Sequence, residues 1–219
     1  HRETFVPEES GHYSRSYYAL DQWYLVPATV SSGQGTVRFS WSTDPDSDAW
    51  QWYDPLGDCG YRTVSVAPKG VEVWAANNRA LAHLNHSAPR LLHDLGGDDG
   101  VLEFVLSAIA EPAYDDRPAT GGLLLWVDDA NFLRLDWGKL GRRDVALIAC
   151  RHGQDMLIGR GRLPDADGNH LPGPAPRPER VRLRLEARED GVHGLVSLDG
   201  ERWWTVGSAA FAVSQGAQA

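Results

Sequence analysis

Residues 121–137 (GGLLLWVDDANFLRLDW) constrain the fold of this chain more than any other segment. Apolar side chains alternate with other residues on both sides of the polar stretch Asp128-Asp129-Ala130-Asn131. A period of two is typical of β-strands, because successive side chains point to opposite faces of a sheet. The pattern therefore predicts a β-hairpin with a four-residue tip, in an antiparallel sheet that has one buried face and one wet face.

The hairpin also predicts which side chains share a face. With a four-residue tip, the apolar face carries Leu124, Trp126, Leu133, Leu135 and Trp137. Arg134 and Asp136 then lie on the opposite face, beside Leu123 and Leu125. We expect Arg134 and Asp136 to be an exposed pair that adds little stability and offers fixed donors and acceptors to a ligand.

Similar short alternating segments occur along the chain. Strands are expected at 35–41, 61–76 (two strands around Pro68-Lys69-Gly70), 101–109, 144–150, 155–163, 181–189 and 194–207, the last with a hairpin turn at Asp199-Gly200. The Asp- and Pro-rich segments 42–60 and 164–178 are expected to be loops. Apart from a short helix expected near 87–93, no amphipathic helix is predicted, so the pattern favours an all-β sandwich.

The chain is long enough for a single all-β domain, which we place at 21–219 behind an N-terminal arm or linker at 1–20. A chain of this size buries roughly 70% of the surface that its unfolded form exposes, so it needs no disulfides or metal ions to be stable. No segment approaches the length of apolar residues that crosses a membrane. The chain begins with His and lacks a leader-like segment, which favours a processed form or a piece of a longer protein and leaves cytoplasmic and secreted locations open.

Composition narrows the classes of partner. The chain has 30 acidic and 21 basic residues, a net charge of −9, which argues against nucleic-acid binding because that needs a basic surface. Nine Trp are many for this length, and they fit either large core anchors or stacking platforms for sugar rings. Cys59 and Cys150 are too few for a disulfide framework and lack metal-ligand spacing, while a single disulfide between them stays open.

Several segments together resemble a known group of domains. They are WQWYDPLGDCGY (50–61), GVEVWAANNRALAHLNHSAPRLL (70–92), GGLLLWVDDANFLRLD (121–136), IGRGRLP (158–164) and VRLRLEAREDGVHGLVSLDGERWWTVG (181–207). Over residues 48–213 the chain is similar to bacterial domains of the concanavalin A-like lectin/glucanase superfamily that lie close to β-xylosidase C-terminal domains.

The resemblance implies an all-β, two-sheet antiparallel jelly-roll sandwich. In the lectins and glucanases of this superfamily, the concave sheet face holds a saccharide. Related domains of unknown function are appended to multidomain proteins, including regulatory ones. Another strand usually follows the SxDGxxW hairpin. Because this chain ends at SQGAQA after Phe211-Ala212-Val213, the resemblance leaves two expectations open, a domain without its last strand or a chain cleaved at this point.

The glucanase branch is marked by Glu-x-Asp-x-x-Glu on one strand, and this motif is absent. Glu72, Glu103 and Glu186 each lack a second carboxylate two residues further on. A retaining glycosidase needs two carboxyl groups about 5 Å apart, so the sequence predicts a non-catalytic domain. Glu103 is strand-borne and is expected to join Arg134 and Asp136 on the wet face, most simply as part of an ion pair.

Calcium is the one cofactor that the sequence suggests. Acidic loops occur at 43–48, 96–100, 115–116 and 128–129, and sandwiches of the resembled superfamily often carry a structural Ca²⁺. Asp98 and Asp99 are the first candidates for its ligands. Aspartate is also a common turn residue, because its side chain accepts hydrogen bonds from nearby backbone N–H groups.

We therefore expect a non-catalytic recognition module that binds carbohydrate on its concave face. The candidate ligand-binding residues are Arg134, Asp136, Glu103, Trp50, Trp52 and Asp54. Two alternatives stay open: a glycoside hydrolase of the glucanase type, and a structural or protein-interaction domain of a larger regulatory protein, whose partners would be other domains.

Overall fold

The computed structural model describes residues 26–28, 37–38, 50–64, 70–74, 80–82, 84–93, 104–110, 121–138, 144–164, 178, 181–188 and 190–211. All regular elements in these residues are strands, so the all-β prediction is confirmed. The strands are β1 (Val26–Ala28), β2 (Val37–Arg38), β3 (Trp50–Tyr53), β4 (Gly60–Val64), β5 (Gly70–Trp74), β6 (Leu81–Ala82), β7 (Asn85–His86), β8 (Arg90–His93), β9 (Phe104–Ala110), β10 (Gly121–Asp128), β11 (Asn131–Trp137), β12 (Asp144–Arg151), β13 (Gln154–Arg162), β14 (Val181–Arg188), β15 (Gly191–Ser197) and β16 (Trp203–Ala209).

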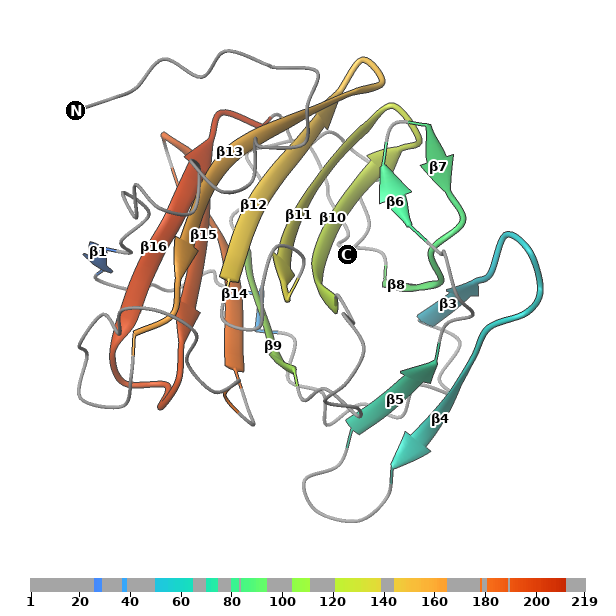
Figure 1. Ribbon diagram of the computed structural model, residues 1–219, viewed down its shortest axis with the longest axis horizontal. Helices are drawn as coiled ribbons and strands as arrows, with labels where there is room; N and C mark the ends of the chain where they lie inside the picture. The colour runs from blue at the N-terminus through green and yellow to red at the C-terminus, as the bar shows by residue number, and fades with distance from the viewer. Residues whose placement is uncertain are drawn as a thin grey trace, which may run out of the picture.

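Two larger sheets make up most of the described structure (Figure 1). One has six strands in the order β1-β16-β15-β14-β9-β2, and the other has four in the order β10-β11-β12-β13. Three two-stranded ribbons, β3–β8, β4–β5 and β6–β7, complete the set. The described pairs are antiparallel except β2–β9, which is parallel, so the expectation of purely antiparallel sheets is wrong at this one pair.

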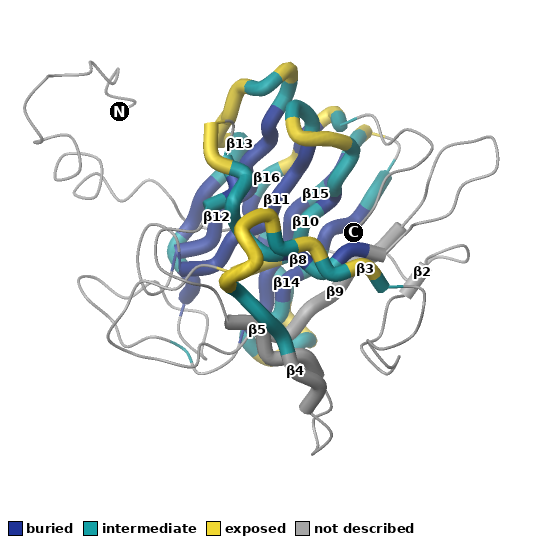
Figure 2. Tube along the Cα trace, turned by 90° about the vertical axis from the view of Figure 1, so that its right-hand side faces the viewer, coloured by how far each residue is buried: buried dark blue, intermediate teal, exposed yellow. Residues whose placement is uncertain are grey.

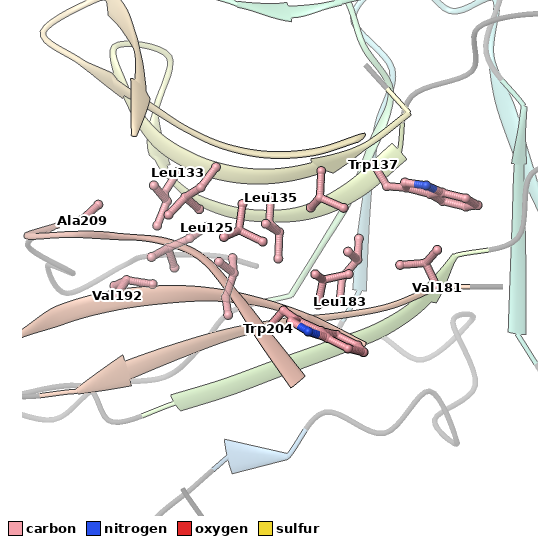
Figure 3. Close-up of a cluster of buried hydrophobic side chains, with 14 of the residues drawn as sticks. Leu125, Leu133, Leu135, Trp137, Val181, Leu183, Val192, Trp204 and Ala209 are labelled. Atoms are coloured by element: carbon pink, nitrogen blue, oxygen red, sulfur yellow. The ribbon is translucent and has the colours of Figure 1, made fainter. Parts of the chain in front are cut away.

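The main core lies between the two larger sheets (Figure 3). Leu133 and Leu135 of β11 meet Leu183 of β14, and all three side chains are fully buried. Trp137 and Trp204 extend the same cluster and are only 2% and 6% exposed. These two tryptophans are therefore core anchors, and burying large apolar side chains is the main source of stability in such a structure.

Among the described residues, the two longest runs of exposed residues are at the start of β13 and at 55–58 (Figure 2). Buried residues run through β11, β12, β14 and β15, whereas the first four residues of β13 are exposed. Exposed residues also gather along 51–58, at the ribbon that flanks the four-stranded sheet. The part of the molecule that can meet a ligand thus includes the β3 region.

The register of the β10–β11 hairpin differs from the predicted one. Leu124 lies opposite Arg134 and Trp126 opposite Phe132, with a bulge between Trp126 and Asp128. Only Asp129 and Ala130 separate the two strands, so the prediction of a four-residue tip is wrong. Asp128 closes the shorter turn itself, since its Oδ1 accepts hydrogen bonds from the Ala130 N–H (2.7 Å) and the Asn131 side-chain amide (2.9 Å).

This register changes which side chains share a face. Leu124 and Trp126 lie on the same face as Arg134 and Asp136, not with the core leucines, because cross-strand partners point the same way. The predicted separation of Arg134 and Asp136 from Trp137 is correct, since Trp137 lies in the core between the sheets. The face away from that core thus carries aromatic as well as charged groups.

Two further predictions of local structure are wrong. The expected loop 42–60 contains strand β3, and the expected helix near 87–93 contains strand β8. The two segments pair with each other, Trp52 opposite Leu91 and Tyr53 opposite Arg90. Each of these segments is a strand because it pairs with the other, some 40 residues away in the sequence. Local sequence patterns do not reveal such a long-range pairing.

Strands predicted in 35–41, 61–76, 101–109, 144–150, 155–163 and 181–207 are confirmed with shifted bounds. The arm expected at 1–20, most of the loop expected at 164–178 and the chain end after residue 211 lie outside the described residues.

The predicted turn at Asp199-Gly200 is confirmed. Gly200 has a positive φ of 88°, and Asp199 Oδ1 accepts hydrogen bonds from the backbone N–H groups of Glu201 and Arg202, both at 2.8 Å. The Ser197 hydroxyl donates to the same oxygen at 3.1 Å. Partial burial raises the pKa of the Asp199 carboxyl, but the hydrogen bonds outweigh it and hold the pKa well below its usual range.

We expect Asp199→Ala to lower the free energy of unfolding by about 1 kcal/mol at pH 7, a modest loss because the turn is partly exposed. A pKa depressed in the folded state gives stability above the unfolded pKa of about 4, and this stability disappears as pH falls further. Urea unfolding should therefore show a gap between wild type and variant that narrows below about pH 4. Glu201→Ala, which leaves the accepting carboxylate in place, is the control, and a gap independent of pH would contradict the assignment.

Candidate functional site

The structure brings Arg134 and Asp136 together, as predicted, but buries them. Arg134 Nε lies 3.5 Å from Asp136 Oδ2, and the two side chains are only 8% and 9% exposed. Arg134 Nη1 also donates to the carbonyl oxygen of Leu81, and Nη2 lies 3.7 Å from Asp155 Oδ2. The expectation of an exposed pair on an open sheet face is therefore wrong.

The cover over this pair is the segment that contains β6, β7 and β8. Leu81 of β6 forms a second apolar cluster with Phe132 and Cys150, on the face of the four-stranded sheet that points away from the main core. Figure 1 shows β6 and β7 beside the β10–β11 hairpin. Because these residues fill that face, a ligand cannot reach Arg134 and Asp136 directly.

The open part of this region is a groove at the edge of the covered face. Its volume is about 460 Å³, and it lies between the β3–β8 ribbon and the end of β10. The groove is lined by Gln51, Trp52, Tyr53, Arg90, Leu92, Trp126, Val127, Asp128 and Asp129. It thus joins segments from three distant parts of the sequence.

Four flat groups lie close together at the groove, and three of them, Tyr53, Arg90 and Trp126, line it. The Arg90 guanidinium carbon lies 4.2 Å from the ring centroid of Tyr53 and 4.1 Å from that of Trp126. Phe132 stacks behind Trp126, with 5.4 Å between ring centroids and 15° between the planes. We call Tyr53, Arg90, Trp126 and Phe132 the aromatic stack. Its guanidinium lies close to two rings, an arrangement stabilised by cation–π attraction.

Strand geometry explains why these side chains meet. Tyr53 and Arg90 are cross-strand partners in the β3–β8 pair, so they point to the same face of the ribbon. Trp126 and Phe132 are partners across the hairpin in the same way. The aromatic stack therefore consists of one cross-strand pair from the β3–β8 ribbon and one from the β10–β11 hairpin.

Trp50 and Trp52, predicted as ligand-binding residues, alternate with Gln51 and Tyr53 and belong to the other face of the ribbon. The Trp52 ring packs on Tyr61, with 4.9 Å between centroids and 44° between planes. Trp52 borders the groove, whereas Trp50 and Asp54 are not among its lining residues. Of these three predicted residues, the structure places one at the groove.

The positive charge in the groove is buried and the negative charges are exposed. Arg90 is 8% exposed, and Asp129, whose side chain is 68% exposed, holds Oδ1 3.7 Å from Arg90 Nη2. The same oxygen lies 3.4 Å from His86 Nδ1. Burial lowers the pKa of Arg90, and the neighbouring Tyr53 and Asp129 partly offset this effect. The side chain stays cationic, because arginine does not lose its proton in proteins.

Arg90 also has unused hydrogen-bonding capacity. Its Nε and Nη1 atoms are buried, and no acceptor among the described residues bonds to them. A buried donor without an acceptor typically costs about 1–3 kcal/mol. Tyr53 is 46% exposed, so it is the more accessible of the two aromatic residues next to this guanidinium.

The acidic residues near the groove have mostly local roles. Both oxygens of Asp128 accept from the Asn131 side-chain amide, at 2.9 and 3.1 Å. Asp54 Oδ2 accepts from the Cys59 N–H at 2.8 Å, and the ligand atoms of Asp54, Asp58 and Cys59 lie within 4.8 Å of one another. Such exposed acidic groups are common without an ion, and the structure therefore assigns no cation to them.

The other predicted positions are three acidic residues and the two cysteines. Glu103, Asp98 and Asp99 lie outside the described residues. Cys59 and Cys150 are free thiols, so they do not form the disulfide that the sequence left open. Burial raises the pKa of the Cys150 thiol, and the Asp155 carboxylate adds to this effect.

Sequence reasoning missed Tyr53, Arg90 and Asp129 as members of a site. The alternation Gln51-Tyr53 on one side and Trp50-Trp52 on the other was a usable signal, since it separates two faces of a strand. Arg90 had no such signal, because its position depends on the pairing of β3 with β8.

Comparison of the chain with protein-family models, curated proteins and solved structures finds no match. Within the residues that the structure describes, no helix is long and apolar enough to cross a membrane. Inference about function therefore rests on the groove and the strands that build it.

Proposed function

We propose that this chain is a non-catalytic recognition module that binds a saccharide in the groove between the β3–β8 ribbon and the β10–β11 hairpin. The two larger sheets would form a jelly-roll sandwich of the concanavalin A-like type, with the groove at the edge of its concave face. The observation that carries the proposal is the aromatic stack, in which an exposed Tyr53 ring lies over a buried guanidinium with unused donors.

The groove combines the two kinds of surface that a sugar requires. A pyranose ring offers an apolar C–H face, which suits the half-exposed ring of Tyr53. Its hydroxyl groups donate and accept, which suits the carboxylates of Asp128 and Asp129 and the Gln51 amide. Sites of this size and mixed lining are typical of small-ligand binding.

The same residues favour binding over hydrolysis. The groove's two carboxylates, Asp128 and Asp129, are adjacent in one turn, and both oxygens of Asp128 are hydrogen-bonded within that turn. A glycosidase needs two carboxyl groups on opposite sides of the scissile bond. The described residues of the groove do not supply such a pair.

We expect Tyr53→Ala to weaken binding about tenfold for any glycan that the wild-type protein retains on an array. Truncating an aromatic anchor at a binding site typically costs more than about 1 kcal/mol, and about 1.4 kcal/mol corresponds to tenfold. The protein should keep its melting temperature within a few degrees, because Tyr53 is exposed. Titration calorimetry with the strongest array ligand measures the effect.

Two variants serve as controls for this experiment. Tyr53→Phe keeps the ring and should bind within about threefold of wild type, since it loses one hydroxyl but no stacking surface. Leu84→Ala removes an apolar side chain that is 85% exposed and outside the groove lining, and it should bind as wild type does. Undiminished binding by Tyr53→Ala would place the recognition surface elsewhere, and a wild-type protein that retains no glycan would contradict the proposed function.

A further inference from the structure

We infer that the groove selects neutral saccharides and rejects those that carry carboxylates. This inference rests on the proposed function and names the class of ligand for the same site. It follows from which charged side chains of the groove are accessible to a ligand. Among the described lining residues, the one arginine is buried, and the two carboxylates are exposed at the rim, the entrance of the groove.

The positive charge is not available to an incoming anion. The Arg90 guanidinium carbon lies 4.2 Å from the ring centroid of Tyr53 and 4.1 Å from that of Trp126, and the residue is only 8% exposed, so little of its charge is accessible. One edge already faces a carboxylate, since Nη2 lies 3.7 Å from Asp129 Oδ1. A ligand carboxylate would have to compete with Asp129 for this charge and give up its own hydration in a confined space.

The negative charges, in contrast, stand where a ligand enters. The Asp129 side chain is 68% exposed, and Asp128 beside it is also exposed. Among the lining residues of the groove, one guanidinium and two carboxylates give a net charge of −1. Like charges close together weaken association, and they do so most strongly at low ionic strength.

The exposed carboxylate at the groove entrance fits this class of ligand as well. Carboxylate oxygens only accept hydrogen bonds, and the hydroxyl groups of a neutral saccharide donate to them without adding charge. A uronate replaces a donor hydroxyl with another acceptor-only group.

Matched pairs of glycans that differ in charge test the inference. The probes are oligogalacturonides in methyl-esterified and free-acid form, and equally linked oligomers of glucose and glucuronic acid, printed on one array and titrated in solution. We expect each neutral member to bind at least about tenfold more tightly than its acidic counterpart at low salt, with the ratio falling as salt is raised.

Two variants separate local charge from net charge. Asp129→Asn removes one rim charge and keeps an oxygen for Arg90, so the ratio should fall to about threefold. Glu201→Gln makes the same change in net charge at the β15–β16 turn, outside the groove, and should leave the ratio unchanged. Melting temperatures confirm that both variants fold.

The outcomes are distinct. Equal or tighter binding of the acidic members overturns this inference and leaves the proposed function standing. A ratio that survives Asp129→Asn and high salt also overturns it, because shape rather than charge would then select the ligand. Absence of binding to every glycan on the array contradicts the proposed function, and the inference fails with it.

Discussion

Replacing Arg134 by alanine is expected to lower the free energy of unfolding by about 3–5 kcal/mol, because it leaves a buried carboxylate without its cation. Asp136 is 6% exposed, and Arg134 Nε is 3.5 Å from its Oδ2. The guanidinium also donates to the Leu81 carbonyl, which ties β6 to the four-stranded sheet. The substitution should therefore loosen the cover over this face as well as destabilise the pair.

Urea unfolding of three variants checks this expectation. Arg202→Ala removes an arginine that is 52% exposed and paired with Asp199, and it should cost less than about 1 kcal/mol. The double variant Arg134→Met, Asp136→Leu removes both charges and fills the space, so it should recover most of the lost stability. If Arg134→Ala instead unfolds at the urea concentration of the wild type, the pair is exposed in solution and the covering segment lies elsewhere.

Gly159→Ala is expected to lower the free energy of unfolding by about 3 kcal/mol, at the upper end for overpacking. A Cβ atom at this position in β13 would lie 2.0 Å from the carbonyl oxygen of Val206 in β16. The backbones of the two sheets approach closely here, since a Cβ on Gly207 would in turn lie 3.2 Å from the Gly159 Cα. Backbone cannot move aside as a side chain can, so the strands must separate.

Gly121→Ala is the matched control for this prediction. Gly121 is also a strand glycine, but a Cβ there would meet no atom within 4 Å. The substitution should be neutral or slightly stabilising, because alanine restricts the unfolded chain. Equal stability of the two variants would mean that β13 does not lie against β16.

The strands were largely predictable because their signal is local. Alternation at the start of β14 (Val181–Arg188) reports which side chains enter the core, and this core supplies most of the stability. The turn at Asp199-Gly200 was predictable for the same reason, since its geometry depends on four consecutive residues. Local chemistry of this kind is fully contained in the sequence.

The hairpin register at 121–137 was not predictable from alternation alone. Whether the tip has two or four residues depends on Asp128, which can end a strand or begin a loop, and its hydrogen bonds to Ala130 and Asn131 decide the outcome. The change brought Trp126 onto the same face as Arg134. One turn thus moved an aromatic ring from the expected core into the candidate site.

The site itself depends on contacts between distant segments. Arg134 and Asp136 could be placed on one face from the sequence, but their burial follows from Leu81, more than 50 residues earlier. Arg90 enters the groove only because β8 pairs with β3. No period or motif in a single segment contains this information, which explains why Trp52 alone, of the predicted ligand-binding residues that the structure describes, lines the groove.

The most direct test of the proposed site is a two-dimensional NMR titration of ¹⁵N-labelled protein with the neutral glycan that gives the strongest array signal. We predict that the largest shifts occur at the backbone amides of 51–53, 90–92 and 126–129 and at the Trp126 indole, the residues around the groove. Shifts confined to the exposed start of β13 or to the six-stranded sheet, with these amides unchanged, would contradict it.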